Sequence, residues 1–253
     1  MTIPALLRPS LLLLAAVLLS GPARAAELTV SAAVSLSSAF KDLAPLFEAA
    51  HPGHKLQFNF GASGGLLQQI SQGAPVDVFA SADQETMDQA HSRHLIDAAQ
   101  RRNVVSNALV LIVPAESPKA PQALAELAQA GYARIAIGLT ASVPLGRHTK
   151  SALTAARLWT AVEPKMIAAQ NARQALDYVA RGEVDAGFVY ATDAALLPDK
   201  VKVVLRVPTP QPILYPAAPV AGSANAELAR RFVAFLATAP AQALLAKHGF
   251  GPP

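Results

Sequence analysis

The segment FGASGG, Phe60 to Gly65, joins two stretches of different character. KLQFNF, which ends inside it, is typical of a β-strand, whereas GGLLQQISQ, which begins inside it, indicates a short helix closed by Gly73. The glycines remove side chains that would keep a ligand away from the backbone at the turn. A strand, a tight turn and a helix in this order form one unit of an α/β fold.

Short β-rich runs alternate with helix-length segments along the rest of the chain, which favours α/β units around a mostly parallel sheet. The predicted strands are LTVSAA (28–33), KLQFNF (55–60), VDVFAS (76–81), NALVLIVP (107–114), RIAIGL (134–139), DAGFVY (185–190), VKVVLRV (201–207) and ILYPAAPV (213–220). The predicted helices are residues 35–50, 64–72, 172–180 and 226–248, with a further helix that Asp83 would cap.

Two apolar runs, LVLIVP and ILYPAAPV, bracket the middle of the chain. This spacing suits two lobes, with the chain crossing from lobe one to lobe two and back. We therefore expect lobe one to comprise residues 26–107 and 213–253, and lobe two residues 108–212. The Pro-rich segment VPTPQP (207–212) is interpreted as a surface connector.

The first 25 residues have the pattern of a secretory signal peptide. Arg8 precedes the apolar run LLLLAAVLLS, and Ala23 and Ala25 form an A-x-A cleavage site. This predicts export to the periplasm with cleavage near Ala25. No later apolar run approaches the roughly 20 residues that a membrane-spanning helix requires. The mature chain is therefore expected not to be inserted in a membrane.

The composition of the mature chain argues against nucleic-acid partners and against disulfides or a lipid anchor. Removal of residues 1–25 takes away two arginines, so 21 basic residues become 19 against 17 acidic ones, a net charge of +2. Such a balance argues against nucleic-acid binding, which needs a concentrated basic face. The chain has no cysteine, so it has neither a disulfide nor the attachment point of an N-terminal lipid anchor.

Ser63 allows three interpretations. GASGG fits the G-x-S-x-G nucleophile elbow of serine hydrolases, but His148 and His248, the only histidines after His94, lack a recognisable triad setting. The glycines alone would also serve a plain turn before a helix. The third interpretation is anion binding, because a serine immediately before a helix directs its hydroxyl and the first free N–H groups to one point.

A second serine supports the anion-binding interpretation. In SAAVSLSS, Ser35 follows a predicted strand and starts a predicted helix, as Ser63 does. In a parallel sheet both would lie at the carboxyl ends of neighbouring strands, where ligands usually bind. A third helix start, QNARQALDYV, has Asn171 as its predicted cap.

Five segments together resemble the periplasmic molybdate-binding proteins of ABC transporters. They are AAVSLSSAFKDLAPLFE, FNFGASGGLLQQISQGAPVDVFASAD, VPLGRHTKSAL, QNARQALDYVARGEVDAGFVYATDA and LAKHGF. The resemblance covers essentially the whole mature chain. The combination of S-L near the start, G-A-x-x-D-x-F-x-S-A-D and G-x-V-Y-x-x-D-A in this order is specific.

The resemblance implies a type II periplasmic binding protein, whose two α/β lobes are joined by two crossing strands and hold the ligand in the cleft between them. The implied ligand is molybdate or tungstate, bound by neutral hydrogen-bond donors without a cofactor. The implied binding residues are Ser35 and Ser63 through hydroxyl and N–H, Leu145 and Ala172 through backbone N–H, and Tyr190 through its phenol.

The sequence departs from the family at three positions near this implied site. The family often has alanine where Leu145 stands and valine where Ala172 stands, which leaves a backbone contact possible in both cases. Leu145 is bulkier and could reshape the mouth of the site. His148 stands where the family often has tyrosine, and Arg173 is expected to be solvated or ion-paired.

The resemblance further implies a monomer that delivers its ion to the membrane permease of an ABC transporter and is not an enzyme. Two alternatives stay open, a carrier of sulfate or phosphate and a periplasmic serine hydrolase with Ser63 as nucleophile. The H-x-x-H pairs His51/His54 and His91/His94 are interpreted as surface histidines, because no carboxylates with ligand spacing accompany them.

Overall fold

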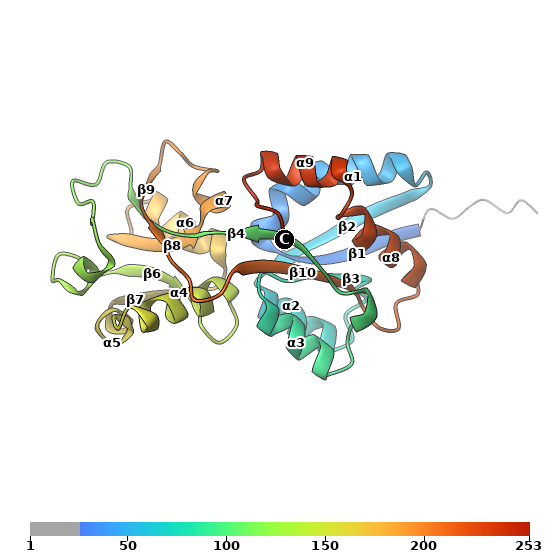
Figure 1. The fold of residues 1–253 in the computed structure, drawn as a ribbon, viewed down its shortest axis with the longest axis horizontal. Helices are drawn as coiled ribbons and strands as arrows, with labels where there is room; N and C mark the ends of the chain where they lie inside the picture. The colour runs from blue at the N-terminus through green and yellow to red at the C-terminus, as the bar shows by residue number, and fades with distance from the viewer. Residues whose placement is uncertain (1–25) are drawn as a thin grey trace, which may run out of the picture.

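The computed structural model describes residues 26–253, which form two α/β lobes side by side (Figure 1). The predicted signal peptide, residues 1–25, lies outside the described residues. Lobe one is built on a sheet of order β2-β1-β3-β10-β4, and lobe two on a sheet of order β7-β6-β8-β5-β9.

Each sheet has five strands and is mixed rather than mostly parallel. The strands of lobe one are β1 (Ala26–Ala33), β2 (His54–Gly61), β3 (Val78–Ala80), β4 (Arg102–Asn107) and β10 (Ile213–Pro219). Those of lobe two are β5 (Leu109–Pro114), β6 (Ile135–Gly138), β7 (Met166–Ala169), β8 (Ala186–Tyr190) and β9 (Val201–Val207). In lobe one β1 pairs parallel with β2 and β3, whereas β10 is antiparallel to both of its neighbours. In lobe two β6 pairs parallel with β7 and β8, whereas β5 is antiparallel to both of its neighbours, β8 and β9.

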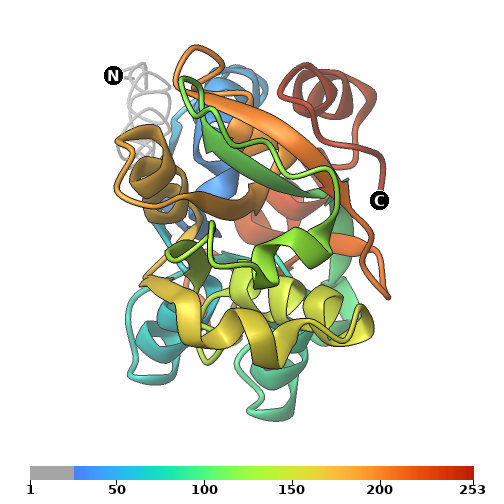
Figure 2. The same cartoon turned by 90° about the vertical axis from the view of Figure 1, so that its left-hand side faces the viewer.

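Helices cover the sheets of both lobes. In lobe one they are α1 (Ser37–Ala50), α2 (Ser63–Ser71), α3 (Gln84–Ser92), α8 (Ala226–Phe235) and α9 (Ala239–Lys247), with the 3-10 turns η1 (Val34–Leu36) and η2 (Ala98–Gln100). In lobe two they are α4 (Pro144–Ala155), α5 (Trp159–Val162), α6 (Ala172–Ala180) and α7 (Ala191–Ala194), with η3 (Leu124–Ala128) and η4 (Glu163–Lys165). Figure 2 looks onto lobe two, where α4 and α6 both pack on β6 and β8. No described helix has the length and apolar character needed to cross a bilayer.

Apolar side chains from both faces of the sheets form the core. Leu28, Val30 and Phe40 in lobe one, and Ile135 and Phe188 in lobe two, are all fully buried. A second cluster joins α2 and α3 to the other face of the lobe-one sheet and includes Leu66, Met87 and Phe79. These cores fix the strand ends and helix starts that face the other lobe.

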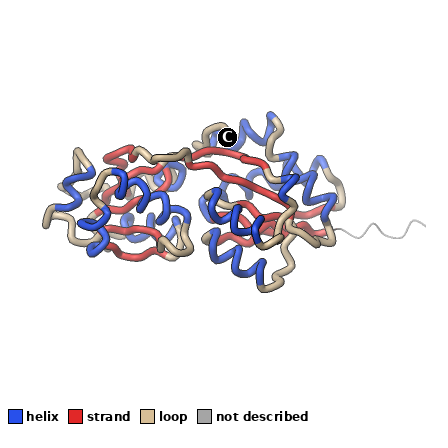
Figure 3. The backbone as a smooth tube through the Cα atoms, turned by 60° about the horizontal axis from the view of Figure 1, so that its bottom comes forward, coloured by secondary structure: helices blue, strands red, loops and turns tan. Residues whose placement is uncertain are grey.

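The chain passes between the lobes twice (Figure 3). The first crossing lies between β4 and β5, and the second between β9 and β10. The C-terminal end is held beside the first crossing, because Ser106 and Gly251 exchange two backbone hydrogen bonds of 2.9 and 3.0 Å. The lobe limits expected at 107/108 and 212/213 remain a prediction, and the strands on either side of these limits belong to different sheets.

Three local predictions were wrong. The run 107–114 is not one strand, because β4 ends at Asn107, which lies in lobe one, and β5 begins at Leu109 in lobe two. Residues 226–248 form two helices; Pro240 in the first turn of α9 has no N–H to continue the preceding helix. Ser35 belongs to η1 rather than to α1, which begins at Ser37.

Candidate functional site

A small cavity lies between the two lobes. It is lined by Ala33, Val34, Ser35, Gly61, Ala62, Ser63 and Ala82 of lobe one, and by Val143, Pro144, Leu145, Ala172 and Tyr190 of lobe two. All five residues predicted to bind the ligand are in this set, although they come from five separate segments of the chain. The cavity is small, with a volume of about 10 Å³.

Three helices begin at the cavity. Ser63 is the first residue of α2, Leu145 the second of α4 and Ala172 the first of α6. The first N–H groups of a helix have no partner within it and carry its partial positive charge. Asn171 caps α6 by accepting a 3.0 Å hydrogen bond from Gln174 N, as predicted. The cavity is therefore surrounded by backbone donors from both lobes.

Ser63 was expected immediately before the helix, but it is the first helical residue and Ala62 occupies the cap position without a capping side chain. Its side chain is fully buried, and its Oγ accepts a 3.0 Å hydrogen bond from Ala82 N. A backbone N–H can only donate, so one of the two lone pairs of the Ser63 hydroxyl is occupied. The hydroxyl hydrogen remains as a donor for a ligand in the cavity.

Tyr190 ends β8 and is 1% exposed. Its hydroxyl has no hydrogen-bond partner among residues 26–253, although nearly all buried polar atoms in proteins have one. Burial raises the pKa of Tyr190 well above its ordinary value, so the phenol keeps its proton. This side chain is a buried donor at the cavity wall whose partner would be the ligand.

No charged side chain belongs to the cavity lining formed by the described residues. Two arginines lie close to the lining residues in sequence, but both are paired with a carboxylate. Arg147 Nε is 2.7 Å from Asp83 Oδ2, and Arg173 Nη2 is 3.5 Å from Asp193 Oδ1. An anion in the cavity would therefore be held by neutral dipoles, and the expectation that Arg173 is ion-paired fits this contact.

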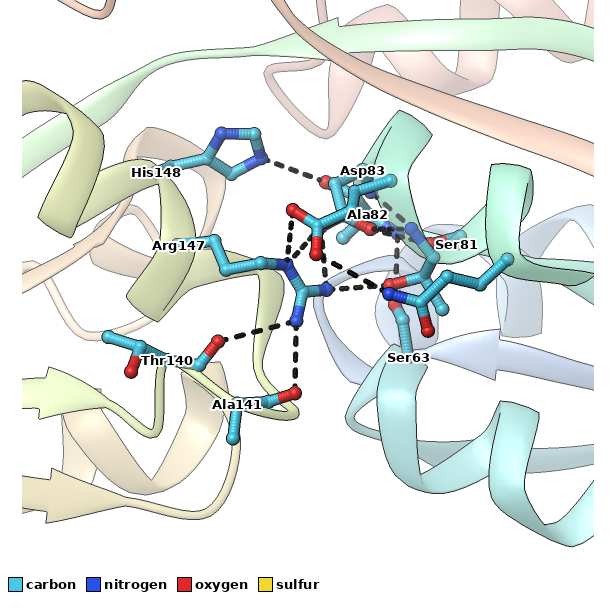
Figure 4. A network of polar contacts seen from close by, with 11 residues as sticks. Ser63, Ser81, Ala82, Asp83, Thr140, Ala141, Arg147 and His148 are labelled. Atoms are coloured by element: carbon cyan, nitrogen blue, oxygen red, sulfur yellow. Dashed lines mark hydrogen bonds and ion pairs between the residues drawn. The ribbon is translucent and has the colours of Figure 1, made fainter.

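Side chains of α4 reach across the boundary between the lobes beside the cavity (Figure 4). Arg147 Nη2 donates a 2.6 Å hydrogen bond to Thr86 Oγ1 in addition to its ion pair with Asp83. His148 Nε2 is 3.2 Å from the carbonyl oxygen of Ala82, which can only accept, so Nε2 carries the hydrogen. Burial lowers the pKa of His148, which keeps the ring neutral near pH 7. These contacts exist only while the lobes are together.

The geometry gives little support to the alternative interpretations, a serine hydrolase at Ser63 and a metal site at the histidine pairs. His148 bonds to Ala82 O and His248 to Asp42 Oδ2 at 3.0 Å, so neither is bonded to the Ser63 hydroxyl. His51 packs on the Phe47 ring, and the described residues contain no group of three potential metal ligands.

Three polar residues beside the cavity were not identified from the sequence. Arg147 and its partner Asp83 are 64 residues apart, and Asp83 was predicted only as the cap of α3, which it is, accepting a 3.1 Å bond from Thr86 N. Tyr215 contacts Ser35 and Asn107 through its hydroxyl, and it is 108 residues away from Asn107 in the chain. In the sequence, Tyr215 and Asn107 stand out only as polar side chains within the apolar runs ILYPAAPV and NALVLIVP.

The chain is similar to known proteins over almost its whole length. The chain is 35% identical over 232 residues to the molybdate-binding protein ModA of Escherichia coli, covering 88% of each. It is 32% identical over 233 residues to ModA of Haemophilus influenzae, covering 90% of this chain and 91% of that protein. The solved periplasmic molybdate-binding protein of Azotobacter vinelandii matches with a TM-score of 0.76 at 26% identity, covering 89% and 99%.

These likenesses confirm the predicted two-lobed α/β fold of a periplasmic binding protein. The family model described as bacterial extracellular solute-binding protein matches residues 28–251. This chain therefore belongs to the family of bacterial extracellular solute-binding proteins.

Proposed function

We propose that this protein captures molybdate or tungstate outside the cytoplasm and delivers the ion to the permease of an ABC transporter. The cavity supports this most directly, because neutral donors from both lobes surround it and no charged side chain of the described residues lines it. The identity of 35% to the E. coli molybdate-binding protein over most of both chains supports the same ligand.

A dianion can be held without a charged side chain when enough donors point at it. A hydrogen bond to a charged group contributes about 1.5–3 kcal/mol, so several together replace the hydration shell of the ion. The hydroxyls of Ser35, Ser63 and Tyr190 and the backbone N–H groups of Leu145 and Ala172 are the donors that we assign to this role. Because they belong to different lobes, only the closed arrangement uses all of them, and the ligand therefore favours closure.

The decisive experiment is calorimetric titration of the mature chain with molybdate, tungstate, sulfate and phosphate. We expect binding of the two larger oxyanions and much weaker binding of the other two. Ser63→Ala should weaken molybdate binding by about 1–3 kcal/mol at unchanged thermal stability. Ser71→Ala is the matched control, since its hydroxyl bonds to Leu67 O at the far end of the same helix. An unchanged affinity in Ser63→Ala contradicts the site assignment, and preferential binding of sulfate or phosphate contradicts the assigned ligand.

We further propose that the protein is a carrier rather than an enzyme, that it is a monomer, and that export removes residues up to Ala25. A fluorophosphonate label tests the first point, since stoichiometric modification of Ser63 would indicate a hydrolase. Light scattering of the purified protein tests the second. N-terminal sequencing of the protein isolated from the periplasm tests the third.

A further inference from the structure

A chain of buried hydrogen bonds runs from the first lobe crossing to the cavity. Asn107 Nδ2 is 3.2 Å from the hydroxyl of Tyr215, and this hydroxyl is 3.1 Å from Ser35 Oγ. Tyr215 is 1% exposed and Ser35 7% exposed, so water does not compete strongly for these groups. The direction of each bond in this chain decides what Ser35 presents to the cavity.

The amide of Asn107 has only one possible orientation. Its Oδ1 is 2.8 Å from Ala108 N, which can only donate, so this atom is the oxygen. The opposite atom is then the nitrogen, and its two hydrogens match two acceptors, Thr192 Oγ1 at 2.9 Å and the Tyr215 hydroxyl at 3.2 Å. Tyr215 therefore accepts a hydrogen bond from Asn107.

The remaining bond of Tyr215 follows from this. Because its oxygen accepts from Asn107, its single hydrogen is free to be donated to Ser35 Oγ. Burial also raises the pKa of Tyr215, which keeps this hydrogen in place. Ser35 Oγ then accepts from Tyr215 through one lone pair, and its own hydrogen stays available to a ligand in the cavity.

We propose that Asn107 and Tyr215 are positioning residues that make Ser35 a hydrogen-bond donor, and that they thereby set the preference of the cavity for fully deprotonated oxyanions. This inference rests on the proposed function. Ala82 N occupies one lone pair of Ser63 in the same way, so both serines keep a hydrogen for the ligand. A protonated anion such as hydrogen arsenate needs an acceptor for its own O–H, and these bonds leave each serine only one lone pair to offer, which disfavours it.

The test compares molybdate with arsenate at mildly alkaline pH, where arsenate keeps one proton and molybdate keeps none. Both ions carry two negative charges, so the ratio of their affinities reports the proton rather than the charge. Tyr215→Phe removes the donor to Ser35, so both lone pairs of the serine oxygen are then free to accept from the ligand. We expect the ratio of molybdate to arsenate affinity to fall by about tenfold, equivalent to one hydrogen bond.

Asn107→Asp is an independent test, because it should reverse the direction of the hydrogen bonds in the same chain. A carboxylate in place of the amide accepts from Tyr215, so Tyr215 accepts from Ser35 and the serine presents its oxygen to the cavity. The added negative charge weakens the binding of both dianions alike. The reversed direction of the hydrogen bonds lowers the ratio of molybdate to arsenate affinity further. A circular dichroism melt of each variant shows whether it is folded, and either folded variant is sufficient for the test.

Two further variants separate the possible outcomes. Tyr190→Phe removes a hydroxyl from the cavity wall without changing the bonds of Ser35, so both ions should bind more weakly and the ratio of molybdate to arsenate affinity should not fall. Tyr132→Phe removes a buried phenol of lobe two that does not line the cavity, and both affinities should match the wild type. If the wild type binds molybdate but Tyr215→Phe and Asn107→Asp keep its affinity ratio, the positioning role is wrong. If the wild type does not bind molybdate, the proposed function itself is wrong.

Discussion

The amide nitrogen of Gly64 donates a 3.0 Å hydrogen bond to the carbonyl oxygen of Ser142, which joins the first turn of α2 in lobe one to the loop before α4 in lobe two. A Cβ atom on Gly64 would lie 2.5 Å from that oxygen and 2.9 Å from Ser142 Cα. Backbone atoms cannot give way as the end of a flexible side chain can. The absence of a side chain at Gly64 is thus a condition for the two lobes to meet at this point.

Gly64→Ala should weaken molybdate binding, because the added methyl group collides with lobe two only in the closed arrangement. Overpacking costs about 1–3 kcal/mol, and we expect the loss of binding free energy to be in this range. Gly65→Ala is the matched control, since its Cβ would have no neighbour within 4 Å. Calorimetry of both variants checks this, and equal affinities would show that the lobes do not approach here when the ion is bound.

Arg147→Ala should also weaken molybdate binding, by about 1–3 kcal/mol. The side chains of Arg147 and Asp83 are only 14% and 5% exposed in the closed arrangement, whereas separated lobes would expose them to water. Removing the arginine therefore costs the closed form more than the open one. Arg230→Ala breaks an exposed pair with Glu227 inside lobe one and should leave affinity unchanged. The same affinity in both variants would exclude a role of Arg147 in closure.

Leu145→Ala should destabilise the fold more than it affects binding. The Leu145 side chain is fully buried in the core, and truncation of such a leucine costs about 2–5 kcal/mol. The backbone N–H assigned to the ligand is retained in this variant. Urea unfolding and calorimetry should therefore show lower stability with near-normal affinity, opposite to Ser63→Ala. A large loss of affinity at normal stability would show that the side chain shapes the site.

Asp193 should make the stability of the protein depend on pH. It is fully buried, and burial raises its pKa to about 6 from the ordinary value of 3.8, against the opposing charge of Arg173. The folded state therefore holds this proton more tightly than the unfolded state. Its contribution to stability is largest at low pH and is lost as the pH rises from about 4 to about 6, by roughly 3 kcal/mol.

Asp193→Asn removes this titration while keeping a similar shape. Urea unfolding of the wild type and the variant over this pH range should give a difference in unfolding free energy that shifts in favour of the variant as the pH rises. The comparison cancels the carboxylates that act in the opposite direction, such as Asp185, whose pKa is lowered. Parallel stability curves would show that Asp193 does not titrate in this range.

Local sequence patterns were sufficient to predict those helices and strands whose ends are determined by a few neighbouring residues. β9 and α6 begin and end where the sequence predicted, and Asp83 and Asn171 cap their helices, because composition and capping act locally. The break at Ala108 was missed, since nothing in NALVLIVP marks where one sheet ends and the other begins. That break depends on which strands lie alongside, which is a property of the tertiary structure.

The same limit applies to the site. The residues that line the cavity belong to segments with a family resemblance, so they could be identified from the sequence. Asn107, Tyr215 and Arg147 act through partners that are far away in the chain, and no local pattern connects them. The roles proposed for them rest on the direction and the location of each hydrogen bond, which only the structure gives.

The neutral lining of the cavity has a consequence for the medium in which the protein works. Salt weakens attraction between exposed charges over about 10 Å at 0.1 M ionic strength, but it acts much less on contacts enclosed by protein. Dipoles fixed around an enclosed ion are contacts of this second kind. Capture should therefore continue as the salinity outside the cytoplasmic membrane rises and falls with the surroundings of the cell.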